Sequence, residues 1–225
     1  VLAGLRRSRG KGFGGYAVSP GAICLAEPAG YLPQEIWFTC SNVSDDDLRA
    51  IPDPRVVINV NSMSEIDRCL RLELPNPIAL RVNPDVRAGH HVDVVTAGSG
   101  VKFGIDVAEI DDARMVVEDS GREVVGLHAH IGSGIDSIDP LLQSAQILIE
   151  LAPDFDNLRW INFGGGIGVP YRPGDREFPI DEYGRGLARG AGDYLNARGL
   201  HAGWEPGRDV VAAAGVAVPR VTARK

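Results

Sequence analysis

Short apolar runs alternate with amphipathic helical stretches along almost the whole of this 225-residue chain. Seven of the runs have the length and composition of strands, and they lie near residues 14, 37, 57, 80, 126, 161 and 202. Strands separated by helices pair in parallel, because each helix returns the chain to the same edge of the sheet. The sequence therefore predicts an α/β protein with one parallel sheet and helices packed outside it.

The positions of the polar motifs favour one kind of parallel sheet. Three of them, at residues 128–133, 164–166 and 205–208, each follow a predicted strand. A doubly wound open sheet could hold seven strands, but it usually binds its ligand at one switch point. Many strand ends that converge on one site are typical of a (β/α)8 barrel. Such a barrel needs eight strands, and the helix at residues 1–9 should follow one, so we expect the first strand upstream of Val1. A start at Val1 rather than Met agrees with a fragment.

Charge and cysteine content exclude several classes of function. The net charge of -7 argues against a nucleic acid or an anionic membrane as partner. Cys24, Cys40 and Cys69 are odd in number and have no CxxC spacing, so we expect neither a zinc site nor disulfides, and a cytoplasmic location. The pair His90-His91 has no acidic or cysteine partner at ligand spacing, so no metal site is expected.

Two loops rich in small residues suggest an anion site. Gly164, Gly165 and Gly166 lack the Cβ atoms that would keep an anion away from backbone N–H groups. A tight strand-to-loop turn would explain the same triplet. Ser133, which lies between two glycines at the end of the preceding strand, offers a hydroxyl donor. Two such loops at neighbouring strand ends favour a phosphate site.

Four side chains suit a flat cofactor with a ring nitrogen. His128 and His130 alternate, so they point the same way from a strand; His128 reads as a buried histidine and His130 as a ring that stacks on a ligand. Glu205 would keep a pyridine nitrogen protonated, and Arg208 would clamp a carboxylate or phosphate. A surface Glu–Arg pair is the alternative. Arg81 is either an interior polar group or part of a structural salt bridge.

Six motifs in order then resemble a known family, the alanine-racemase-like (fold type III) PLP-dependent decarboxylases. Within that family the diaminopimelate decarboxylases are the most similar, and the stretch from Arg87-Ala88-Gly89-His90-His91 to Lys102-Phe103-Gly104 favours them over the ornithine and arginine enzymes. The motifs lie at residues 18–21, 80–86, 102–105, 126–133, 162–168 and 205–208.

The resemblance implies a pyridoxal 5'-phosphate (PLP) barrel at residues 1–215, with residues 216–225 starting the connection to a C-terminal β domain. It implies a homodimer with active sites at the interface, and loss of CO2 from meso-diaminopimelate to give L-lysine. His130 would stack on the PLP ring, and Glu205 would pair with its nitrogen, both as catalytic residues. The implied cofactor site is completed by Ser133, Gly164, Gly165, Gly166, Gly207 and Arg208, and Arg208 would also bind the substrate.

The chain departs from the family in three ways. The family's Schiff-base lysine belongs to the first barrel strand, which we expect upstream of Val1; Tyr16 is not its replacement, since Ser19-Pro20-Gly21 aligns with the exit of the second strand. The β domain contributes residues that this chain does not contain, and Ala22 stands where relatives often have an acid. We therefore expect the isolated chain to be inactive and poorly stable. Alternatives are a non-catalytic regulatory or binding homologue and a decarboxylase of ornithine, arginine or carboxynorspermidine.

Overall fold

The computed structural model describes residues 2–39, 41–86, 102–215 and 218. The strands form one sheet in the order β1-β2-β3-β4-β6-β7-β8, and every pair in it is parallel. All seven predicted strands are therefore confirmed, and the short β5, which pairs with the end of β4, is an addition. The strands are β1 (Gly15–Ala17), β2 (Ile36–Phe38), β3 (Val57–Val60), β4 (Ile78–Asn83), β5 (Ile105–Asp106), β6 (Val124–His128), β7 (Trp160–Gly165) and β8 (His201–Glu205).

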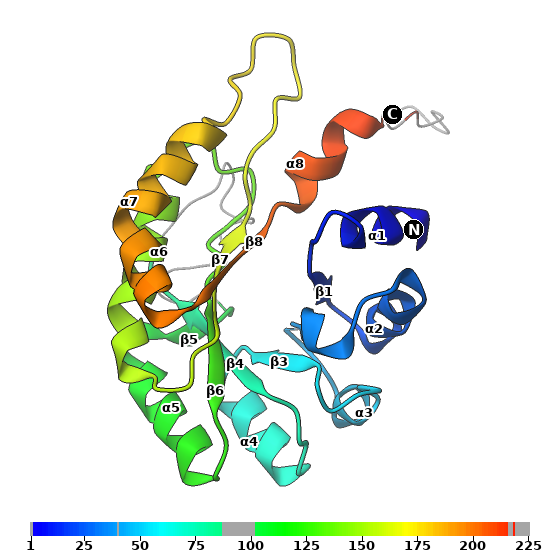
Figure 1. Cartoon of the computed structure of the whole chain (residues 1–225), viewed down its shortest axis with the longest axis vertical. Helices are drawn as coiled ribbons and strands as arrows, with labels where there is room; N and C mark the ends of the chain where they lie inside the picture. Colours follow the sequence, from blue (N-terminus) through cyan, green and yellow to red (C-terminus); the bar gives the residue numbers. More distant parts are fainter. Residues whose placement is uncertain (1, 40, 87–101, 216–217, 219–225) are drawn as a thin grey trace, which may run out of the picture.

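The helices lie outside the curved sheet, as Figure 1 shows. Helices α5, α6 and α7 cover one side of it, and α1 and α2 lie beside β1 at its other end. No described helix has both the length and the apolar character needed to cross a membrane. The α-helices are α1 (Leu2–Arg9), α2 (Pro20–Ala26), α3 (Asp45–Arg49), α4 (Met63–Arg71), α5 (Ile110–Asp119), α6 (Asp139–Leu151), α7 (Ile180–Arg198) and α8 (Gly207–Val211).

Serine caps fix the starts of three helices. Ser19 and Ser44 accept hydrogen bonds from the first turns of α2 and α3, and Ser44 forms a reciprocal capping box with Asp47. Ser62 caps α4 by accepting the backbone N–H of Glu65, but it forms no reciprocal capping box. The Glu65 carboxylate instead accepts the backbone N–H of Asn61, one residue earlier. This contact ties the start of α4 to the exit of β3.

Two apolar clusters stabilise the fold. The larger one lies between the outer face of the sheet and the helices, and it includes Ile58, Leu80, Leu127 and Ile161. The smaller one fills the inside of the sheet, where Trp37 and Trp160 meet edge to face with ring centroids 6.4 Å apart. Strand register places the inner residues in layers, and the next layer toward the carboxyl ends is polar, containing Arg81, His128 and Asn162.

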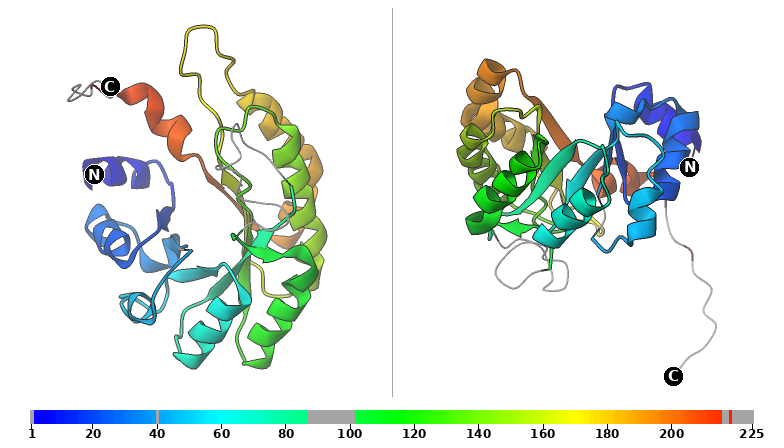
Figure 2. Two further views of the ribbon diagram at one scale, coloured as in Figure 1. Left: turned by 180° about the vertical axis from the view of Figure 1, so that it is seen from behind. Right: turned by 90° about the horizontal axis from the view of Figure 1, so that it is seen from below.

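The sheet is a barrel with one open side. Strands β1 and β8 end the strand order, so each has one edge without a partner among the described strands. Figures 1 and 2 show these edges facing each other across the opening. Strands β2, β3, β4, β6 and β7 are almost wholly buried, whereas β1 and β8 are partly exposed. Large apolar side chains remain exposed beside the two edges: Phe13, Tyr16 and Val18 near β1, and Trp204, Val210 and Val211 near β8.

Some predictions fall outside the described residues. These are the interpretation of His90-His91, the family signature at residues 87–91, Cys40, and most of the connection at residues 216–225. They stay predictions.

Candidate active site at the carboxyl ends of the strands

Glu205, the last residue of β8, is the centre of the site. Its Oε1 atom accepts a hydrogen bond from Asn162 Nδ2 at 2.8 Å and lies 3.1 Å from His128 Nε2. Its Oε2 atom lies 3.6 Å from His130 Nδ1. The carboxylate side chain is only 14% exposed, so these contacts take the place of water. Glu205 is therefore bound from β6 and β7 together.

Asn162 has an unambiguous orientation. Its Oδ1 atom accepts the backbone N–H of Gly164 at 2.9 Å, so its amide nitrogen must be the atom that faces Glu205. Asn162 lies in β7 beside His128, its register partner in β6. The side chain thus joins the glycine turn to the carboxylate.

His128 is buried, with 1% of its side chain exposed, as the sequence predicts. Its Nδ1 atom lies 2.9 Å from Asn59 Nδ2, whose other proton goes to Thr39 Oγ1 at 2.9 Å. The Nε2 atom has no well-aligned hydrogen bond, although Glu205 Oε1 is within 3.1 Å of it. His128 thus points a fully buried nitrogen at the carboxylate.

The protonation states of this cluster follow from burial and charge. Burial lowers the pKa of His128 despite the nearby Glu205 charge, so the ring is neutral at neutral pH. Burial raises the pKa of Glu205, but the contacts with His128 and His130 together outweigh it, and the pKa lies below its usual range. Burial raises the pKa of Tyr16, and Glu205 raises it further. The cluster therefore contains a buried carboxylate that faces the buried, neutral ring of His128.

Tyr16 enters the site from the open edge. Its hydroxyl lies near Thr39 and Glu205, which both affect its pKa, and its ring centroid lies 6.1 Å from that of His128. The ring itself is 38% exposed, because β1 has no strand on its outer side. The hydroxyl is enclosed while the ring faces the opening.

His130 lies at the rim, with 24% of its side chain exposed. Its Nδ1 atom accepts the backbone N–H of Gly165 at 3.2 Å. Because Nδ1 accepts this hydrogen bond, it has a lone pair rather than a proton. At 3.6 Å from Glu205 Oε2, Nδ1 therefore does not donate a hydrogen bond to the carboxylate. The glycine turn therefore orients the His130 ring.

The glycine triplet is required by close backbone packing. A Cβ on Gly164, Gly165 or Gly166 would overlap a carbonyl oxygen of Ala129, Glu205 or Gly132, respectively. The N–H groups of Gly164 and Gly165 are already donated to Asn162 and His130. Two of the N–H groups of the triplet thus orient side chains. A phosphate role for Gly164, Gly165 and Gly166 stays a prediction.

Ser133 and Arg208 meet at the same end of the barrel. Arg208 Nη2 donates to Ser133 Oγ at 3.0 Å, and its guanidinium carbon lies 5.8 Å from the ring centroid of Tyr171. Gly207, which starts α8, has open space where a Cβ would be. Arg208 does not pair with Glu205 in the surface ion pair considered as an alternative; it reaches back across the sheet to the loop after β6.

Arg81 is an interior residue, 7% exposed, and among the described residues it makes no salt bridge. Its Nη1 atom donates to Asn61 Oδ1 at 3.3 Å, and its guanidinium lies 5.0 Å from the ring centroid of Phe103. Asn61 Oδ1 also accepts the N–H of Gly104. These contacts place the motif at residues 102–105 over the mouth of the barrel.

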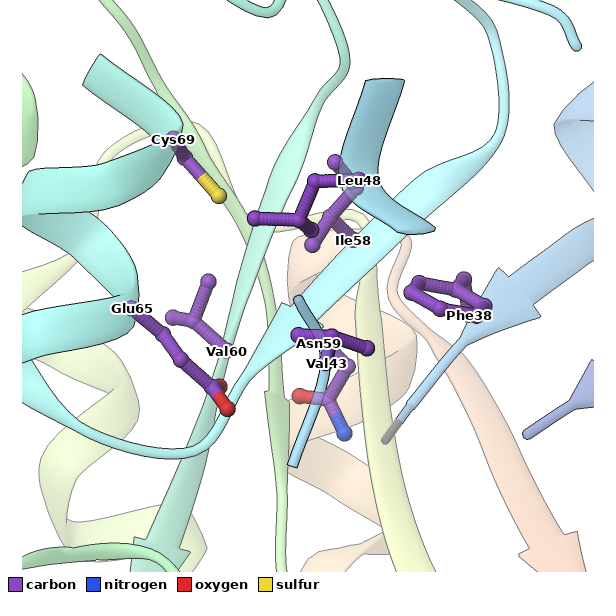
Figure 3. Close-up of a pocket in the computed structure, with 8 residues that line it drawn as sticks. All are labelled: Phe38, Val43, Leu48, Ile58, Asn59, Val60, Glu65 and Cys69. Atoms are coloured by element: carbon purple, nitrogen blue, oxygen red, sulfur yellow. The ribbon is translucent and has the colours of Figure 1, made fainter. Parts of the chain in front are cut away.

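Figure 3 shows a different cavity, outside β3 and away from the mouth. Its volume is only about 10 Å³, room for about one water molecule, so it cannot hold a cofactor. Glu65 and Cys69 enter it from α4. It is lined by Phe38, Val43, Leu48, Ile58, Asn59, Val60, Glu65 and Cys69.

The structure brings together every site residue predicted from the sequence. His130, Ser133, Gly164, Gly165, Gly166, Glu205, Gly207 and Arg208 all lie at the carboxyl end of β6, β7 or β8. Sequence reasoning missed Tyr16, Thr39, Asn59 and Asn162. Their signal in the sequence was weak, because they are single polar residues in or beside apolar strands. That they face the interior can be inferred only when the strand register is known.

Fold and site together define a class, the parallel barrels of the alanine-racemase-like type, in which PLP is the cofactor. Residues 3–212 match the family described as pyridoxal-dependent decarboxylase, pyridoxal binding domain. The chain belongs to this family.

Several curated relatives are diaminopimelate decarboxylases, whereas the similar structures also include an arginine decarboxylase of Paramecium bursaria Chlorella virus at 20% identity and a TM-score of 0.74. The diaminopimelate decarboxylase of Methanothermobacter thermautotrophicus is 38% identical over 236 residues, covering 100% of this chain and 54% of that protein. The Pseudomonas aeruginosa diaminopimelate decarboxylase is 36% identical, covering 91% and 50%. The crystal structure of the Helicobacter pylori enzyme complexed with L-lysine superposes with a TM-score of 0.85 at 27% identity, covering 94% of this chain and 55% of that one. The chain thus spans about half the length of these relatives.

Proposed function

We propose that this chain is the cofactor-binding barrel of a PLP-dependent decarboxylase that converts meso-diaminopimelate to L-lysine. The observation that carries the proposal is Glu205, an ionised carboxylate held by Asn162 and His128 at the mouth of the barrel. A protonated ring nitrogen needs such an acceptor. The names of the relatives supply the substrate.

The donor set at the mouth suits the rest of the cofactor. His130 presents a partly exposed flat ring for stacking, and Arg208 with Ser133 supplies donors for a phosphate. When bound, PLP would supply the electron sink for the electron pair left on the α-carbon when CO2 departs. Glu205 maintains the proton on the ring nitrogen, and the glycine turn fixes the angle of His130 through Gly165.

The open side of the barrel supports a further part of the proposal. A parallel strand between β8 and β1 would pair both free edges and cover the exposed Trp204 and Tyr16. We place the lysine that anchors the cofactor on this strand, within a longer polypeptide. The homodimer and the C-terminal β domain of the family belong to the same proposal.

Substrate choice is tested on the full-length protein with PLP. Release of CO2 is measured with meso-diaminopimelate, L-ornithine, L-arginine and carboxynorspermidine, and product is identified by mass spectrometry. We expect L-lysine from meso-diaminopimelate, with the other three at least about a hundredfold slower. Faster turnover of another amino acid would overturn the assignment of meso-diaminopimelate as the substrate. No turnover of any of the four would favour the non-catalytic homologue.

The location of the anchoring lysine has its own test. Borohydride reduction after incubation with PLP, followed by peptide mapping, identifies every modified lysine. We expect the 225-residue chain to show no stoichiometric adduct at Lys11, Lys102 or Lys225, which are its only lysines, and the full-length protein to show one elsewhere. A unique adduct at Lys102, whose amine lies 5.1 Å from the Phe103 ring centroid, would contradict the proposed strand.

A further inference from the structure

The contacts of His128 determine which of its ring nitrogens has the proton. Nε2 lies 3.1 Å from a carboxylate oxygen, and a lone pair there would face the Glu205 charge inside a buried site. The proton is therefore on Nε2, and because the buried ring is neutral, Nδ1 is an acceptor. Asn59 must then turn its NH2 group toward His128, which is the orientation observed at 2.9 Å.

Asn59 is itself held in that orientation. Its second amide proton is donated to Thr39 Oγ1 at 2.9 Å, and both residues are buried, with exposures of 2% and 6%. If the amide were rotated, its oxygen would require a proton on Nδ1, and the neutral ring would turn a lone pair toward Glu205. Donation thus begins at Asn59, which donates to both Thr39 Oγ1 and His128 Nδ1, and it continues from His128 Nε2 toward the carboxylate.

We propose that Asn59 and His128 are positioning residues for Glu205: Asn59 holds His128 as the Nε2–H tautomer, and that N–H fixes Oε1 of the carboxylate. Oε1 then has two interior donors, His128 and Asn162, and Oε2 is the oxygen that meets an incoming ring nitrogen. In this structure Nε2 lies 3.1 Å from Oε1 but makes no well-aligned hydrogen bond with it. This role rests on the proposed function, because it serves the carboxylate that receives the cofactor.

Among the groups around His128, Asn59 is the one that controls the tautomer of its ring. Tyr16 presents its ring to His128 at a tilt of 47°, not its hydroxyl. Arg81 and Asn162 flank His128 in register, but neither makes a hydrogen bond to its ring, since Arg81 donates to Asn61 and Asn162 to Glu205. Only Asn59 touches Nδ1 among the described residues. A change at Asn59 should therefore act on the tautomer directly.

The first readout needs no cofactor. Long-range ¹H–¹⁵N NMR of the full-length protein without PLP distinguishes the two neutral tautomers and the cation, and the H128Q spectrum identifies the His128 signals. We expect the Nε2–H tautomer between pH 7 and 8. Asn59→Leu should produce a mixture of tautomers, and Asn59→Asp should protonate Nδ1 as well. A wild-type Nδ1–H tautomer, or an unchanged His128 signal in Asn59→Leu, would overturn the proposal.

The second readout is PLP affinity, followed by absorbance. Gln at position 128 keeps an N–H donor, so His128→Gln should bind PLP within about threefold of wild type, whereas His128→Leu should bind about tenfold more weakly. Equal affinity of the two variants would sink the positioning role. Asn76→Leu removes another buried amide, bonded to the carbonyls of Asp53 and Val56 far from the site, and is the control for loss of packing.

The two proposals fail separately. If the tautomer responds to Asn59 but the protein does not bind PLP, the proposed function fails and the tautomer control stands. If the protein binds PLP and decarboxylates its substrate while Asn59→Leu leaves His128 unchanged, only the positioning role fails.

Discussion

Gly165 and Glu205 are register partners across β7 and β8, and the Gly165 backbone lies so close to Glu205 that a Cβ on it would overlap the Glu205 carbonyl oxygen. The same glycine donates its N–H to His130. One backbone contact thus sets the positions of both the carboxylate and the imidazole. Because Gly165 has no side chain, β7 and β8 can approach each other closely enough to form the site.

Gly165→Ala should therefore destabilise the full-length protein by about 3 kcal/mol or more, since the methyl group meets backbone that cannot rotate away. Gly184→Ala is the matched control, because its Cβ would enter open space on α7. That change should stabilise the protein by about 0.5–1 kcal/mol. Urea unfolding measures both. Equal effects of the two substitutions would contradict the packing described here.

Arg208→Lys should weaken PLP binding about tenfold while leaving the free energy of unfolding nearly unchanged. Lysine keeps the charge but loses the planar fork that reaches Ser133. Fluorescence titration with PLP measures the affinity. Arg159→Lys is the control, because Arg159 pairs with the exposed Glu123 far from the mouth. A wild-type affinity in Arg208→Lys would remove Arg208 from the cofactor site.

His128 should make the protein less stable as the pH falls below about 6.5. Burial places its folded-state pKa below the usual 6.5, so below that pH the unfolded chain binds a proton that the folded chain does not. The slope is at most about 1.4 kcal/mol per pH unit. Glu205 acts in the same direction but below its usual 4.5, because its folded-state pKa is lowered.

Free energies of unfolding at pH 5 to 7 test this dependence. The His128→Gln variant should show a flatter curve in that window, and Glu205→Gln should differ from wild type mainly in its slope below pH 4.5. His201→Gln, at an exposed position, is the control. An unchanged slope in His128→Gln would show that the ring takes up its proton equally in the folded state.

Cys69 should resist thiol reagents until the protein unfolds. It is 1% exposed, and burial raises the pKa of its thiol to about 11. Cys24 is exposed and should react first. Peptide mapping after brief treatment with iodoacetamide compares the two cysteines in one sample. Early modification of Cys69 would mean that α4 opens away from β3 in the native protein.

The sequence predicted all seven principal strands and the whole rim of the site, because both depend on local signals. Glu205, His130 and Ser133 stand out as polar residues directly after apolar runs. Asn59 and Asn162 could not be found in this way, since their roles depend on which strands are neighbours and in what register. The glycine triplet was only partly understood for the same reason. Its N–H groups donate hydrogen bonds to Asn162, in the same strand, and to His130, which follows the neighbouring strand.

The free edges of β1 and β8 have a consequence for how such a protein reaches its native state. Gly15 and His201, at the starts of these strands, are 186 positions apart, so any strand that joins them makes the most distant pairing in the sheet. Contacts between such distant segments form slowly, because the intervening chain must first be ordered. Closure of the ring should be the last event of folding, and the ribosome must release nearly all of this stretch before it can begin.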